Sequence, residues 1–69
     1  MTAGQKIREL RQAAGLTQEE CAMKLGVVRS RWADIEADRH DATVGMLRRV
    51  AAVLGCRVEV IWKRKRKEA

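Results

Sequence analysis

The 69 residues are enough for one small domain, and 46% hydrophobic residues without Pro, Tyr or Phe indicate a mainly α-helical chain. The formal net charge of +6 comes mostly from residues 63–69, which hold five basic groups and one acid, so charge alone argues weakly for nucleic acid. No apolar run reaches membrane-spanning length, and the single His and two Cys form no metal-ligand or catalytic pattern. We therefore expect a cytoplasmic protein with no membrane partner, no enzymatic activity and no cofactor.

A first helix is expected over about residues 2–14. Gly4 lies in its first turn, where we expect fraying to cost little. Gly15 is the expected end of the helix. Three apolar residues are expected to face inward: Ile7, Leu10 and Ala14.

Two short helices are expected between residues 16 and 36. Thr17 and Glu20 have the spacing of a capping box, and Gly26 supplies the left-handed residue that ends the first helix. The second helix begins almost at once, because apolar residues then recur at helical spacing. Two short helices joined by a turn containing Gly are the pattern of a helix-turn-helix. The residues expected to be buried are Cys21, Ala22 and Leu25 on the first helix and Val28, Trp32 and Ile35 on the second.

These residues resemble the Xre (Cro/cI-type) helix-turn-helix family, in which a stretch like residues 16–27 precedes a recognition helix and a Glu. The resemblance covers about residues 7–55. It implies a four-helix, lambda-repressor-like domain over residues 1–55 that binds double-stranded DNA. It also implies that Arg11 and Glu36 form a partly buried structural ion pair, and that Cys21 is a small core residue where the family usually has Leu.

A fourth helix is expected from its N-cap at Thr43 to a stop at Gly55. Residues 56–63 then alternate between apolar and polar, which predicts a β-strand; a helix with an accidental alternation is the alternative. A lone strand has no hydrogen-bonding partner, so we expect it to pair across a homodimer, as in antitoxins of the HipB type. Residues 64–69 would form a disordered basic tail. The predicted dimer contacts are Arg57, Val58, Glu59, Val60, Ile61 and Trp62, with exposure of Trp62 to another protein as an alternative.

On the recognition helix, Arg29 can bridge guanine O6 and N7, although a solvated face is the alternative for Arg29 and Arg31. Asp34 either accepts from cytosine N4 or pairs with Arg31, and so either sharpens sequence choice or weakens binding. The roles of Arg48 and Arg49 stay open between a solvated face, a phosphate contact and a dimer contact. The predicted base contacts are Arg29, Ser30, Ala33 and Asp34, and the predicted phosphate contacts are Thr17, Gln18, Arg31, Arg39 and His40.

We therefore expect a sequence-specific transcriptional repressor that binds a palindromic operator as a homodimer, with two recognition helices in successive major grooves. The alternative is an antitoxin that neutralises a protein toxin and regulates its own operon. Both functions can coexist in one protein. A toxin-like neighbouring gene would favour the antitoxin, whereas a restriction-enzyme gene would favour a restriction–modification controller.

Overall fold

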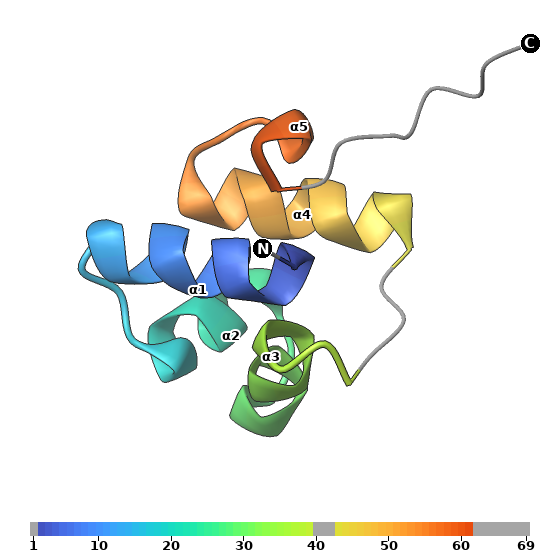
Figure 1. The fold of residues 1–69 in the computed structure, drawn as a ribbon. Coiled ribbons are helices and arrows are strands. Elements are labelled where there is room, and N and C mark those ends of the chain that lie inside the picture. Colours follow the sequence, from blue (N-terminus) through green and yellow to red (C-terminus); the bar gives the residue numbers. More distant parts are fainter. Residues whose placement is uncertain (1, 40–42, 62–69) are drawn as a thin grey trace, which may run out of the picture.

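The computed structural model describes residues 2–39 and 43–61. Within these residues the chain forms five helices, α1 (Ala3–Ala13), α2 (Gln18–Leu25), α3 (Arg29–Glu36), α4 (Val44–Leu54) and α5 (Val58–Ile61). α3 packs against α1 and α2, and α5 packs against α4 and α1, so α3 and α5 lie on opposite sides of the molecule (Figure 1). Across the described ranges, no helix is both long enough and apolar enough to span a membrane.

Local sequence signals set most of the helix ends. Thr2, Thr17 and Thr43 are the N-caps of α1, α2 and α4, and each side chain accepts a hydrogen bond from a backbone N–H of the first turn. Gly26 ends α2 at a φ of 84°, a left-handed conformation that a residue with a Cβ adopts only with strain. The predicted caps at Thr17 and Thr43 and the predicted stop at Gly26 are therefore confirmed.

The core combines residues from all five described helices. Trp32 is its largest fully buried side chain, at 0% exposure. Cys21 is equally buried, and burial raises the pKa of its thiol, as expected for a small apolar core residue. Ala14, which we expected to face inward, is exposed after the end of α1. The buried apolar residues are Ile7, Cys21, Ala22, Leu25, Trp32, Ile35, Leu47, Val50, Ala51 and Ile61.

The predicted strand at residues 56–63 is wrong where the structure describes it, because Val58–Ile61 form the short helix α5. Val58 and Ile61 are three residues apart and share one helix face. Ile61 is 6% exposed in the core, and Val58 packs against that core. Ile61 is therefore buried within its own chain and is not available as a dimer contact. The predicted contact Trp62 and the predicted tail at 64–69 lie outside the described residues.

The prediction that Val28 is buried is also wrong. Val28 is the N-cap of α3, with an extended backbone, and its side chain is 70% exposed. The helical spacing that linked it to Trp32 and Ile35 does not apply, because α3 begins one residue later, at Arg29. Trp32 and Ile35 are buried as predicted.

Candidate nucleic-acid interface

The two faces of α3 differ sharply in their surroundings. Trp32, Ile35 and Glu36 are buried against the rest of the domain. On the opposite face Ser30 is exposed and is flanked by two exposed basic residues, Arg29 and Arg31. Two further predicted base contacts, Ala33 and Asp34, are half-buried. The exposed face of α3 is therefore polar and partly basic, and the buried face behind it holds an aromatic residue and an acid.

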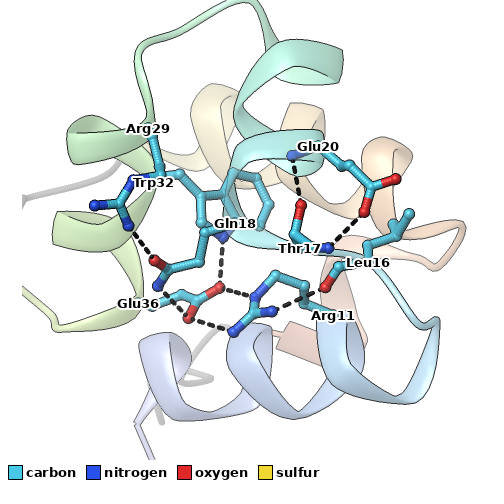
Figure 2. A network of polar contacts seen from close by, with 8 residues as sticks. All are labelled: Arg11, Leu16, Thr17, Gln18, Glu20, Arg29, Trp32 and Glu36. Carbon is cyan, nitrogen blue, oxygen red and sulfur yellow. Dashed lines mark hydrogen bonds and ion pairs between the residues drawn. The ribbon is translucent and has the colours of Figure 1, made fainter.

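Glu36, at the end of α3, is the centre of a buried hydrogen-bond network (Figure 2). Arg11 on α1 donates to the Glu36 carboxylate from Nε at 2.6 Å and from Nη2 at 3.3 Å. Gln18 donates to it from Nε2 at 3.1 Å, and Trp32 donates from Nε1 at 2.5 Å. The ion pair that the family resemblance implied for Arg11 and Glu36 is thus present. Together with the hydrogen bond from Gln18 it joins α1, α2 and α3 at one carboxylate.

The Glu36 side chain is only 4% exposed, so its charge depends on these donors. Burial raises the pKa of Glu36, but the hydrogen bonds from Arg11, Trp32 and Gln18 outweigh this effect, and the pKa lies below its usual 4.5. The carboxylate is therefore ionised at neutral pH. The loss of its charge would leave the guanidinium of Arg11, which also donates to the Leu16 carbonyl, without its acid partner.

Gln18 connects this buried network to the surface. Its Nε2 donates to Glu36, and its Oε1 accepts from Nη1 of Arg29 at 3.0 Å. A carboxylate only accepts and a guanidinium only donates, so these two neighbours leave the Gln18 amide one satisfactory orientation. The predicted base contact Arg29 is therefore linked through Gln18 to the buried acid at the opposite end of its own helix.

A shallow, mainly basic hollow surrounds the start of α2. The predicted phosphate contacts Thr17 and Gln18 both line it. The first turn of a helix favours an anion through its free N–H groups and its dipole. Arg8 on α1 faces the same hollow, although the sequence analysis did not single it out, because a charged residue on an exposed helix face carries no distinguishing signal. The lining residues are Arg8, Arg11, Gly15, Leu16, Thr17, Gln18, Glu19 and Arg29.

Asp34 pairs with Arg39, not with Arg31. The distance between Arg39 Nε and Asp34 Oδ1 is 3.5 Å, and the Arg39 side chain is exposed while that of Asp34 is about half exposed. The ion pair with Arg31 was one of two alternatives for Asp34, and neither considered Arg39, which lies three residues after the end of α3. The pair of Asp34 and Arg39 places a predicted base contact beside a predicted phosphate contact. His40, another predicted phosphate contact, lies outside the described residues.

A second link between α1 and the end of α3 was missed by the sequence analysis. Asp38 has a φ of 59°, and its Oδ1 accepts from the backbone N–H of Gly4 at 2.9 Å. Its Oδ2 accepts from the Thr2 hydroxyl. A Cβ at Gly4 would collide with the Glu36 carbonyl oxygen and would lie 2.7 Å from that of Ile35. Gly4 is therefore a close-approach site, and the expectation that it tolerates fraying is wrong.

Arg49 contributes to structure. Its Nη2 donates to the Leu25 carbonyl at 3.0 Å, which satisfies one of the free carbonyls at the end of α2. Arg48 is exposed on α4. Within the described ranges, no group of three or more His, Cys, Asp or Glu side chains lies close enough together to hold a metal ion.

Residues 2–60 match the model of a family described as "Helix-turn-helix domain". The chain is 43% identical over 61 residues to the immunity repressor protein of Bacillus phage phi105, a match that covers 88% of this chain and 42% of the repressor. It is 35% identical over 54 residues to an uncharacterized HTH-type transcriptional regulator of Archaeoglobus fulgidus, with 78% and 77% coverage.

A solved structure of a SinR protein/SinI protein complex contains a chain with a similar fold. The TM-score is 0.80 at 31% identity, and the match covers 93% of this chain and 63% of that chain. The chain thus spans less than half of the phage repressor and less than two thirds of the solved chain.

Proposed function

Because this chain belongs to the helix-turn-helix domain family, we propose that it is a transcriptional regulator that binds double-stranded DNA with α3 in the major groove. The observation that carries this proposal is the division of α3 into two faces. Arg29, Ser30 and Arg31 are exposed, whereas Trp32 and Glu36 hold the opposite face in place. The name of the phage relative, an immunity repressor, supports repression as the mode of action.

In this proposal each exposed side chain has a chemical role. Arg29 donates to guanine O6 and N7, and Ser30 donates to or accepts from a base edge. Asp34 can accept from cytosine N4 while Arg39 offsets the repulsion between its carboxylate and the phosphates. Ala33 completes the base-contacting surface, and the backbone phosphates are bound by Thr17, Gln18, Arg31 and Arg39.

We further propose that two copies bind a palindromic operator, with their recognition helices about 34 Å apart in successive major grooves. With Ile61 buried in its own chain, the exposed residues Arg57, Glu59 and Val60 are left to contact a second copy. They lie on α5 or just before it, on the side of the molecule away from α3 (Figure 1).

Selection of binding sites from random duplexes, followed by affinity measurement, tests the proposal. We expect a palindromic consensus and an affinity that falls steeply with salt, because phosphate contacts release counterions. Arg29→Ala should weaken the selected site about tenfold and relax one base position, since a bidentate guanine contact contributes roughly 1–3 kcal/mol. Lys24→Ala removes one positive charge from an exposed position on α2 and changes no residue of α3, so it should leave the base preference unchanged.

The absence of any sequence preference in the wild-type chain would refute DNA-sequence recognition. A palindrome that persists unchanged in Arg29→Ala would refute the assigned role of Arg29 alone. Sedimentation of the free protein and of its DNA complex checks the dimer separately, because a single copy per operator contradicts the two-fold arrangement.

A second candidate function is an antitoxin that binds a protein toxin and represses its own operon. The expected resemblance to HipB-type antitoxins rested on a terminal strand, and the helix at Val58–Ile61 removes that support. The solved structure with the similar fold is a complex of two named proteins, which favours a test for a protein partner. Co-expression of this chain with a growth-inhibiting product of an adjoining gene tests this function. Restored growth supports an antitoxin, and continued growth inhibition refutes it.

A further inference from the structure

We propose that Val28 recognises the methyl group of a thymine at the start of the recognition helix. This inference rests on the proposed function, since it assigns one element of the operator that α3 would read. It begins from an apolar side chain that is 70% exposed beside Arg29 and Ser30.

Folding does not explain a valine at this position. Thr2, Thr17 and Thr43 occupy the N-caps of α1, α2 and α4 with nearly the same extended backbone conformation, and all three cap their helices with a side-chain hydrogen bond. Val28 has a φ of −74° and a ψ of 154° but makes no such bond. Valine is among the poorest N-cap residues. A residue that breaks a local rule and packs against little of its own domain is a candidate for a functional contact.

The surroundings of Val28 match the chemistry of thymine. Val28 lines a shallow hollow whose other walls include Val27, Ser30 and Arg31. In the major groove, thymine presents a C5-methyl group next to the O4 acceptor. Val28 offers apolar surface to the methyl group, while the hydroxyl of Ser30 can donate to O4.

Deoxyuridine provides the test, because it differs from thymidine in the groove only by the missing methyl group. Each thymine of the selected operator is replaced in turn by deoxyuridine, and Kd is measured with the full chain at the same set of salt concentrations for every duplex. For the wild type we expect one position in each half-site to weaken binding by about fourfold, the effect of one buried methyl group.

The same deoxyuridine series is then measured with Val28→Ala. We expect the deoxyuridine effect on Kd at that position to disappear almost completely, because the variant lacks the valine methyl groups that would cover the thymine. The slope of affinity against salt should stay unchanged, since no phosphate contact is lost. Alanine caps as poorly as valine, so the variant should keep its fold, which a thermal melt checks.

Val44→Ala is the matched control. It makes the same substitution at a valine that is 39% exposed on α4, outside the proposed DNA and dimer contacts, and should keep the full deoxyuridine effect. The inference is overturned if the wild type tolerates deoxyuridine everywhere, or if Val28→Ala keeps the fourfold effect. Either result, with a palindromic consensus still present, leaves the proposed function standing. A wild type that selects no sequence refutes both.

Discussion

α2 and α3 have the same length of eight residues, but they are stabilised in different ways. α2 begins at the capping box of Thr17 and Glu20 and ends at a left-handed Gly26. The N-cap of α3, Val28, makes no side-chain capping bond, and its C-cap Ala37 is not left-handed. Contacts from α1 and α2 hold α3 instead, among them the hydrogen bonds that Arg11 and Gln18 donate to the Glu36 carboxylate. The ends of α2 are thus encoded locally, whereas α3 depends on its tertiary neighbours.

This difference matters for a helix proposed to read DNA. The contacts that hold α3 come from its rear face and its C-terminal end, where Trp32 and Glu36 lie. The exposed residues at its N-terminal end, Arg29 and Ser30, are then not needed to cap or fill the fold. Their side chains can therefore be chosen for base chemistry with little effect on stability.

The largest expected effect comes from removing the centre of the tertiary support. Glu36→Ala leaves the Arg11 guanidinium without its acid partner and the Trp32 N–H without an acceptor, and should cost about 4 kcal/mol of unfolding free energy, measured by urea denaturation. Glu20→Ala is the matched change in the local support of α2, and it should lower the unfolding free energy far less, because Glu20 is exposed. Equal losses in the two variants would contradict the distinction between the helices.

A somewhat smaller effect is expected where α1 meets the end of α3. Gly4→Ala places a Cβ against the Glu36 carbonyl and should cost about 2–3 kcal/mol through overpacking and displacement of α3. Gly45→Ala in α4 meets nothing closer than Thr43 Oγ1, at 3.8 Å, and should instead stabilise by roughly 0.5–1 kcal/mol through helix propensity. Thermal unfolding of both variants measures the contrast. An increase of Tm in Gly4→Ala as well as in Gly45→Ala would show that the backbone approach at Gly4 is not tight.

Acid should weaken α3 through the same carboxylate. The folded pKa of Glu36 lies below its ordinary value of 4.5, so its stabilising contribution is complete above that value and is lost as pH falls through the folded pKa. Urea denaturation of the wild type and of Glu36→Gln across this range should therefore show a stability gap that narrows on acidification. A gap of constant size from neutral pH downward would mean that the ionisation of Glu36 does not stabilise the fold.

The smallest expected effect comes from giving α3 the kind of cap that α2 has. Val28→Thr should stabilise the domain by about 1 kcal/mol, because its backbone already matches that of the threonine caps. Thr17→Val makes the reverse exchange in α2 and should cost a similar amount. Calorimetric melts of both variants check the pair of signs. A destabilised Val28→Thr would mean that the start of α3 cannot accept a capping bond.

The sequence predicted the fold where the responsible signals are local. Thr17, Thr43 and Gly26 act within one helical turn, so their pattern suffices to place the ends of α2 and the start of α4. The contacts of Gly4 and Asp38 join residues 34 positions apart. No periodicity or capping rule contains that information, so the missed link belongs to tertiary structure alone.

The wrong predictions at Val28 and at residues 58–61 have related causes. Helical spacing placed Val28 inward, but the N-cap residue precedes the helix and does not follow its period. At residues 58–61, a short alternation fitted both a strand and one helical turn, and the burial of Ile61 in the core decided for the helix. Of the candidate site, the sequence and its family resemblance identified Arg11, Glu36 and Gln18 but not the hydrogen bond that Arg29 donates to Gln18.

That bond has an entropic consequence for association. An arginine side chain carries about 2 kcal/mol of rotamer freedom, and a flexible one surrenders much of it on meeting its ligand. Nη1 of Arg29 is already tethered to an amide whose own orientation is dictated by a buried anion. Part of the rotamer entropy of Arg29 is therefore lost when the chain folds, so less of it remains to be lost when the guanidinium binds its ligand.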